Sequence, residues 1–140
     1  MQPLTAILLD DDASQAYLFA RTLEDVEDLD VELVHHRKSE PAMTDPRMQS
    51  ADLLFLDHFL GEKETGLDLL RSLRSAGHGG AIVMMTGSDE EGIVTKFLES
   101  GADAYLCKTH LTPLSLGTTI RIALRLPHRG ASQVEAPPRG

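Results

Sequence analysis

The sequence predicts a doubly wound α/β fold, in which a five-stranded parallel sheet carries about five helices on its two faces. Three observations support this class. Short apolar runs recur along the chain, longer segments with helical periodicity separate them, and polar residues follow the apolar runs at once. Strands that alternate with helices form parallel sheets, because the connection between parallel strands must cross the sheet.

Five apolar runs are the predicted strands. Each has four or five residues and is bounded by polar or turn residues, which is typical of strands buried on both faces of a sheet. The second run is weaker than the others, because Glu32 interrupts it. The runs cover residues 6–9, 31–34, 53–56, 81–85 and 104–107.

The segment after the first run predicts an amphipathic helix. Ala16, Phe19 and Leu23 follow the i, i+3, i+7 spacing of one helix face. Asp12 and Gln15 have the spacing of a capping box at its start. Residues 38–50 contain two prolines and have the weakest pattern, so we expect at most a short second helix there.

Three further helices are expected in the second half of the chain. Leu69, Leu70, Leu73 and Ala76 form the stripe of the first, and Gly77 is its expected stop. Ser88 and Glu91 have capping-box spacing before the next. Thr112 and Pro113 are an N-cap and a first-turn proline before the last, whose stripe includes Leu116 and Ile120.

Length and composition limit the organisation of the chain. Its 140 residues are enough for one domain, with 41% hydrophobic and 25% charged residues. We expect the domain to cover residues 1–126. Residues 127–140 contain prolines and glycines but almost no large apolar side chains, so we expect a disordered tail.

Charge and cysteine content narrow the partners and the compartment. The net charge is −9, which disfavours direct contact with nucleic acid or anionic membranes. The single cysteine, Cys107, cannot form an intrachain disulfide, and it is expected to be a small core side chain. No signal peptide or membrane-spanning run is apparent, so we expect a cytoplasmic protein.

The residues that follow the apolar runs form one chemical set. They are three consecutive aspartates, a fourth aspartate, a threonine with a glycine, and a lysine: Asp10, Asp11, Asp12, Asp57, Thr86, Gly87 and Lys108. The carboxyl ends of parallel strands meet at one edge of the sheet, where ligands bind. Clustered carboxylates favour a hard cation such as Mg²⁺, and a carboxylate beside it can attack phosphorus.

The sequence resembles the receiver domain of two-component response regulators, as in the bacterial chemotaxis regulator. Five motifs carry the resemblance in the right order and spacing, over about residues 4–126: ILLDDD, LLFLD, VMMTG, GADAYLCK and LTPLSLGTTIRIAL. It implies a flavodoxin-like sheet with strand order 2-1-3-4-5. It also implies a phosphoprotein that signals through an aspartyl phosphate rather than a turnover enzyme.

The resemblance also implies roles for single residues. Asp57 matches the phosphoacceptor. The Mg²⁺ ligands would be Asp10 through water, Asp11 and Asp57 directly, and the backbone carbonyl of Phe59. Thr86, the Gly87 amide and Lys108 would each contact a phosphoryl oxygen, and Tyr105 matches the aromatic residue that moves with Thr86.

Partners follow from the same resemblance. Such a domain takes its phosphoryl group from a histidine kinase or a histidine phosphotransfer protein. It then acts on a downstream protein target, and we expect the docking face near Lys96, Tyr105 and Arg121. Residues 127–140 are too few to form an output domain, so the chain is expected to act as a stand-alone receiver. Whether phosphorylation drives dimerisation stays open.

Three positions depart from the family pattern. Gly61 stands where the family usually has proline, and the loop from Asp57 to Gly66 is one residue longer than usual. Thr109 follows Lys108 where proline is usual, often across a cis bond. A cis bond before threonine would cost about 2.5–4 kcal/mol, and the sequence does not decide its geometry.

Two alternatives remain. The residues Asp10 to Ser14 fit the D-x-D-x-[ST] pattern of haloacid-dehalogenase-like phosphatases, but the acidic pair that should follow Lys108 is missing. The departures at Gly61 and Thr109 favour a receiver-like binding module that is never phosphorylated. The histidines, including His35 and His36, have no ligand spacing, so no metal role is assigned to them.

Overall fold

The computed structural model describes residues 3–61, 64–87 and 91–126, and these form the predicted α/β fold. A five-stranded sheet has the order β2-β1-β3-β4-β5, with every neighbouring pair parallel. The strands are β1 (Leu4–Leu9), β2 (Val31–His36), β3 (Leu53–Asp57), β4 (Ala81–Thr86) and β5 (Ala104–Cys107). The predicted fold class and strand order are therefore confirmed.

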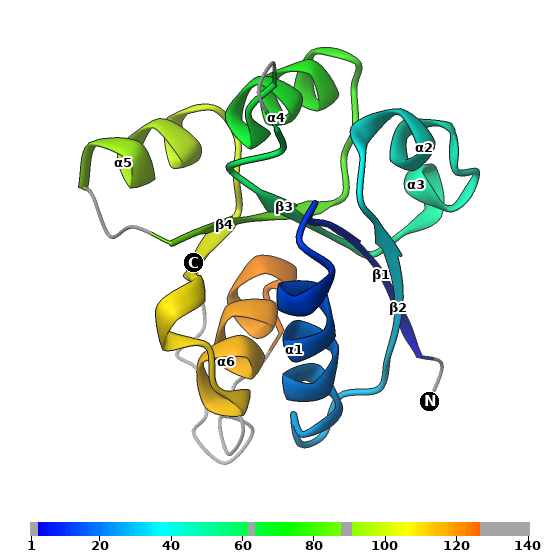
Figure 1. Ribbon diagram of the computed structural model, residues 1–140, viewed down its shortest axis with the longest axis vertical. Coiled ribbons are helices and arrows are strands. Elements are labelled where there is room, and N and C mark those ends of the chain that lie inside the picture. The colour runs from blue at the N-terminus through cyan, green and yellow to red at the C-terminus, as the bar shows by residue number, and fades with distance from the viewer. Residues whose placement is uncertain (1–2, 62–63, 88–90, 127–140) are drawn as a thin grey trace, which may run out of the picture.

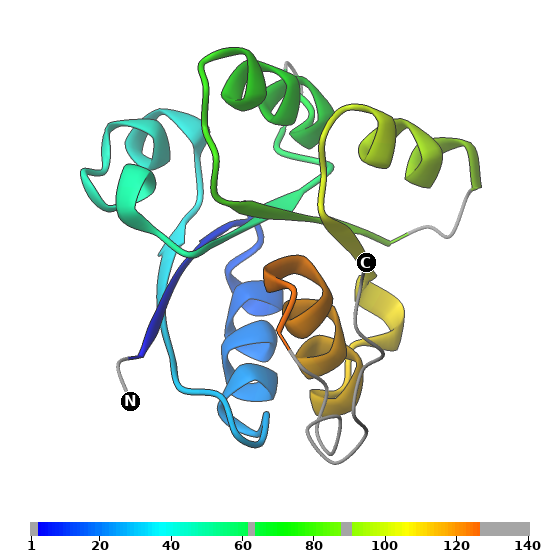
Figure 2. The same ribbon diagram turned by 180° about the vertical axis from the view of Figure 1, so that it is seen from behind.

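The helices cover both faces of the sheet (Figures 1 and 2). On one face lie α1 (Ala13–Glu24) and α6 (Pro113–Leu124). On the other lie α2 (Ser39–Thr44), α3 (Arg47–Ser50), α4 (Gly66–Ser75) and α5 (Glu91–Glu99). A 3₁₀ turn, η1 (Lys108–His110), follows β5.

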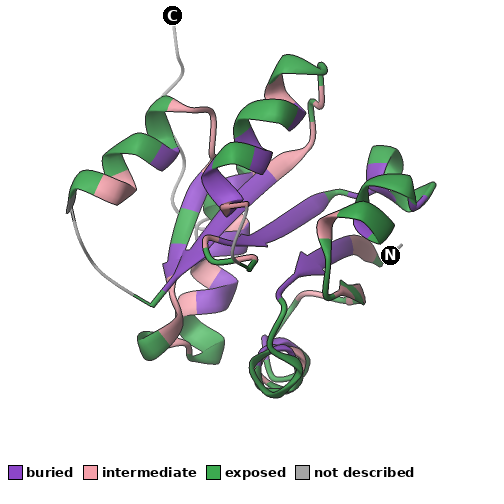
Figure 3. Ribbon diagram, turned by 45° about the horizontal axis from the view of Figure 1, so that its top comes forward, coloured by how far each residue is buried: buried purple, intermediate pink, exposed green. Residues whose placement is uncertain are grey.

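Two apolar layers hold the helices to the sheet. Alternate strand residues point to opposite faces, so Leu8 and Phe55 pack toward α1 and α6, whereas Ile7 and Leu56 pack toward the other four helices. All five residues of β3 are buried, in keeping with its central place (Figure 3). This double burial fixes the carboxyl ends of β1 and β3 firmly beside each other.

The start of α1 differs in one detail from the predicted capping box. Asp12 is the N-cap, and its carboxylate accepts the backbone N–H groups of Ser14 and Gln15. The N–H of Asp12 donates to the Asp10 carboxylate instead of to Gln15. The cap is therefore tied to the acidic residue before it.

The weak segment 38–50 contains two short helices rather than one. α2 ends at Thr44, and the C-cap Asp45 has an extended backbone because the next residue is Pro46. The Asp45 side chain accepts the Arg47 backbone N–H and its guanidinium, and it also bonds His36. These contacts lower the pKa of Asp45 well below its usual range, chiefly through Arg47.

The start of α6 and the end of α4 match their predictions. Thr112 caps α6 in a capping box with Ser115, and Pro113 occupies its first turn. Thr65 and Asp68 form an equivalent box at α4, and Gly77 with φ of +88° follows its end. The Ser88–Glu91 box and the tail from 127 lie outside the described residues.

Among the described residues, no helix has the length and apolar character needed to cross a membrane.

Candidate functional site

The acidic cluster lies at the carboxyl edge of the sheet, where the topology predicts it. Asp10 follows β1, Asp57 ends β3, and Lys108 follows β5. The Lys108 ammonium donates to Asp10 Oδ2 at 2.8 Å and to Asp57 Oδ2 at 3.1 Å. Three segments that are distant in sequence therefore meet through one charged hydrogen-bond network.

Three carboxylates of this cluster could hold one cation. Oxygen atoms of Asp10, Asp11 and Asp57 all lie within 4.8 Å of one another. Asp10 and Asp57 are buried, whereas Asp11 is exposed and faces solvent. A donor set made only of oxygen suits Mg²⁺ better than a softer metal, so the residues present fit the expected ion.

Burial and the Lys108 contacts act in opposite directions on the charges of the cluster, and burial prevails at Asp57. It raises the pKa of Asp57 from 3.8 to about 6, although the charge and hydrogen bond of Lys108 oppose this change. For Lys108, burial alone would lower the pKa, but the hydrogen bond to Asp10 and the Asp57 charge raise it. A cation at this site would stabilise the ionised form of Asp57.

The cluster opens into a shallow cavity of about 350 Å³. Phe59, Gly61 and Gly87 line its walls, beside Asp57 and Lys108. The Phe59 backbone N–H donates to Asp57 Oδ1 at 3.3 Å, which fixes the loop after β3 beside the carboxylate. Thr86 is buried at the end of β4, one residue beyond the partner of Asp57 in the sheet register.

The expected docking residues are not all on one face. Tyr105 is 40% exposed and pairs with Met84, so it lies on the α5 side of the sheet. Lys96 is exposed on α5. Arg121 lies on the opposite layer, and its guanidinium donates to the Glu27 carbonyl beyond the end of α1. The structure therefore brings Tyr105 and α5 to one face, and Arg121 toward the end of α1.

The structure describes two of the three positions that depart from the family pattern, Gly61 and Thr109. Gly61 has φ of +125°, which proline cannot adopt, so the glycine fits this loop. The described residues contain no cis peptide bond, and the Lys108–Thr109 bond is trans. Residues 62 and 63 of the loop after Asp57 lie outside the described residues.

The structure adds two residues that sequence reasoning missed. His35 Nε2 bonds the Asp10 carbonyl at 2.8 Å, and the Arg37 guanidinium donates twice to the Asp11 carbonyl at 3.3 Å. Both residues follow the apolar run 31–34, so they stand after a predicted strand, as the acidic residues do. Neither residue has metal-ligand spacing, because each contacts a backbone carbonyl beside the carboxylates and not an ion.

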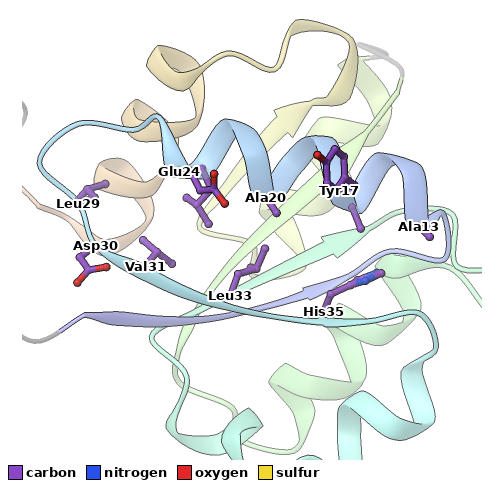
Figure 4. A pocket seen from close by; sticks show the side chains of 11 residues that line it. Ala13, Tyr17, Ala20, Glu24, Leu29, Asp30, Val31, Leu33 and His35 are labelled. Atoms are coloured by element: carbon purple, nitrogen blue, oxygen red, sulfur yellow. The ribbon is translucent and has the colours of Figure 1, made fainter.

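A larger groove lies between α1 and the edge strand β2 (Figure 4). Its volume is about 660 Å³, and its lining is mostly small or apolar, with Glu24 and Asp30 at one end and His35 at the other. None of the three clustered carboxylates lines it. The groove is therefore separate from the acidic cavity.

A family model and solved structures give the same answer about which proteins this chain resembles. The family model of the response regulator receiver domain matches residues 6–116. The BeF3-activated receiver domain of Klebsiella pneumoniae RstA is 28% identical, with a TM-score of 0.73 over 86% of this chain and 98% of that one. No curated protein sequence matched.

Two more distant structures share the fold. A Burkholderia pseudomallei response regulator, solved with a phosphorylated aspartic acid, calcium ion and citrate, is 21% identical, with a TM-score of 0.69 over 94% of this chain and 70% of that one. Thermotoga maritima DrrB is 19% identical, with a TM-score of 0.71 over 89% of this chain. This chain spans 54% of the length of DrrB.

Proposed function

Because this chain belongs to the response regulator receiver domain family, we propose that Asp57 accepts a phosphoryl group and thereby switches a protein-binding face. The donor would be a histidine kinase or a histidine phosphotransfer protein. The observation that carries the proposal is the Lys108 ammonium held between Asp57 and Asp10, beside the third carboxylate, Asp11.

The proposed reaction is a phosphoryl transfer. A carboxylate oxygen of Asp57 attacks phosphorus and forms a P–O bond, while the P–N bond of the donor phosphohistidine breaks and its electron pair stays on nitrogen. Burial beside the Lys108 charge positions the carboxylate, and the cavity leaves its outer side open to a donor. Asp57 must be ionised to attack, so its raised pKa makes a nearby cation important.

Mg²⁺ would be held by Asp10, Asp11, Asp57 and the Phe59 carbonyl, and it would neutralise charge on the phosphoryl oxygens. Lys108 would exchange part of its contact with the carboxylates for a phosphoryl oxygen. Thr86 and the Gly87 amide, at the end of the neighbouring strand, would bind the remaining oxygens. The Burkholderia pseudomallei relative was solved with a phosphorylated aspartic acid, which supports this chemistry for the fold.

The switch would run from Thr86 to Tyr105. Both lie on the α5 side of the sheet, and Tyr105 pairs with Met84, two residues before Thr86. Movement of Thr86 toward a phosphoryl group would open space beneath the half-exposed Tyr105 ring. We propose the surface of Tyr105 and Lys96 as the docking face for a downstream protein.

The test is intact mass after incubation with acetyl phosphate, with and without Mg²⁺. The wild type is expected to gain one phosphoryl group only with Mg²⁺, and Asp57→Asn is expected to gain none. Beryllofluoride binding then distinguishes rapid hydrolysis from absent chemistry. A wild type that binds neither Mg²⁺ nor beryllofluoride would support a binding module that is never phosphorylated.

A further inference from the structure

Asp11 is the exposed member of the three clustered carboxylates and the least constrained of them. Asp10 accepts hydrogen bonds from Lys108 and from the Asp12 backbone, and Asp57 accepts them from Lys108 and the Phe59 backbone. Within the described residues, no hydrogen bond to the Asp11 carboxylate is found, and the side chain is exposed to water. Its position must therefore be set by its backbone.

The two peptide groups that flank Asp11 are both held by the end of β2. The carbonyl before it, that of Asp10, accepts a hydrogen bond from His35 Nε2 at 2.8 Å. A carbonyl can only accept, so the ring carries its proton on Nε2. The carbonyl of Asp11 itself accepts two hydrogen bonds of 3.3 Å from Arg37.

The second of these peptide groups is held on its opposite side as well. The N–H of Asp12, which shares a peptide plane with the Asp11 carbonyl, donates to Asp10 Oδ1 at 2.9 Å. One peptide group earlier, the N–H of Asp10 donates to the His36 carbonyl at 3.1 Å, which continues the pairing of β1 with β2. The Cα–Cβ direction of Asp11 follows from these planes.

We propose that His35 and Arg37, which we call the β2 clamp, are positioning residues that orient Asp11 for the cation. Neither side chain would touch the ion. Each holds a backbone plane that fixes the Cα–Cβ direction of Asp11, as outer-layer hydrogen bonds orient ligands at metal sites. The inference rests on the proposed function, since it concerns the same Mg²⁺ site.

The clamp residues lie at the end of the edge strand β2 and directly after it, since β2 ends at His36 and Arg37 follows. Residues 35 and 36 extend β2 beside Leu8 and Leu9, which brings these side chains to the first residues after β1. Figure 4 shows His35 below the start of α1, at the end of the groove that Ala13 also lines. The ring therefore lies at the surface and can be changed without opening the core.

The test is the Mg²⁺ dissociation constant by isothermal titration calorimetry for wild type and single variants. His35→Ala and Arg37→Ala are each expected to weaken binding about tenfold, the lower end of the range for residues that orient metal ligands. His35→Gln keeps an N–H donor at the position of Nε2 and is expected to bind within about twofold of wild type.

Lys38→Ala is the matched control for Arg37→Ala. It removes one positive charge from the next residue, which is exposed and makes no side-chain cap contact. Loss of either positive charge would by itself favour a bound cation, so weaker binding in Arg37→Ala, but not in Lys38→Ala, cannot come from the electric field. The backbone amide resonances of Asp11 and Asp12 provide a second readout, since only a clamp variant should shift them without metal.

The possible outcomes distinguish failure of the proposed function from failure of the β2 clamp alone. Wild type that fails to bind Mg²⁺ would overturn the proposed function, and the clamp with it. Wild type that binds Mg²⁺ and is phosphorylated, with His35→Ala binding equally well, would overturn the clamp alone. So would loss of affinity in His35→Gln as large as in His35→Ala, since that result would indicate packing of the ring.

Discussion

The Lys108 ammonium lies 3.1 Å from Oδ2 of Asp57, although 51 residues separate the two along the chain. The same ammonium also contacts the buried Asp10 at 2.8 Å. One partly buried cation thus compensates two buried carboxylates. This relationship gives the site its main electrostatic balance when no metal is bound.

Lys108→Ala is expected to lower the free energy of unfolding by about 2 kcal/mol at pH 7, because it leaves two buried carboxylates without their cation. The loss should shrink as the pH falls toward 5, where Asp57 takes up a proton. Urea denaturation at both pH values measures the effect. The exposed Lys96→Ala is the control, and an equal loss in that variant would contradict the explanation.

Asp57→Asn is expected to stabilise the metal-free protein at neutral pH by about 1–2 kcal/mol. Folding raises the pKa of Asp57 from 3.8 to about 6, so the charged carboxylate destabilises the native state above pH 6. The cost disappears as the pH falls from about 6 to about 4, where the carboxyl is protonated in both states.

The measurement is thermal or urea unfolding of wild type and Asp57→Asn from pH 4 to 8 in the presence of a chelator. Their difference should grow with pH between 4 and 6 and then level off. A difference that is constant across this range would mean that burial does not perturb the Asp57 carboxyl. Added Mg²⁺ should reverse the order by stabilising only the wild type strongly.

Gly66→Ala is expected to destabilise the protein by about 2–3 kcal/mol and to impair phosphoryl uptake. An added Cβ at Gly66 would collide with the backbone carbonyl of Asp57, which cannot move without shifting the site. Gly92→Ala is the control, because nothing lies near its Cβ position on α5. That variant should gain about 0.5–1 kcal/mol from helix propensity, as chemical denaturation would report.

Arg74→Ala is expected to cost about 3 kcal/mol in stability while leaving Mg²⁺ affinity unchanged. The guanidinium donates to the carbonyls of His78, Gly80 and Gly101 and to Asp103, at the sheet edge opposite the acidic site. Arg71→Ala, which loses one exposed hydrogen bond, should cost about 0.5 kcal/mol or less. Reduced Mg²⁺ binding in Arg74→Ala would show that the two edges are coupled.

Much of the fold was predictable because its signals are local. The apolar runs of β1, β3 and β4 are buried on both faces, and their double burial makes them continuous in sequence. The caps at Thr112 and Asp12 are fixed by residues within one helical turn. The segment 38–50 was less clear, because Pro46 interrupts the periodicity and contacts of Asp45 with His36 and Arg47 stabilise the break.

The sequence by itself determined which residues stand at the carboxyl ends of the strands. The order of the apolar runs, with Asp10, Asp57 and Lys108 after them, was enough to predict an acidic edge with one cation. These three residues share one edge because crossover connections make all the strands parallel, so that their carboxyl ends lie at the same side of the sheet.

Only the tertiary structure decided how these groups contact one another. The double contact of Lys108, the raised pKa of Asp57 and the contacts of His35 and Arg37 with Asp10 and Asp11 all depend on the exact register of neighbouring strands. Burial and hydrogen-bond geometry arise between segments that are distant in sequence, and no local pattern encodes them. Arg121 is a further example. The Glu27 carbonyl, beyond the end of α1, decides where its guanidinium points, and the position of Arg121 along α6 alone does not.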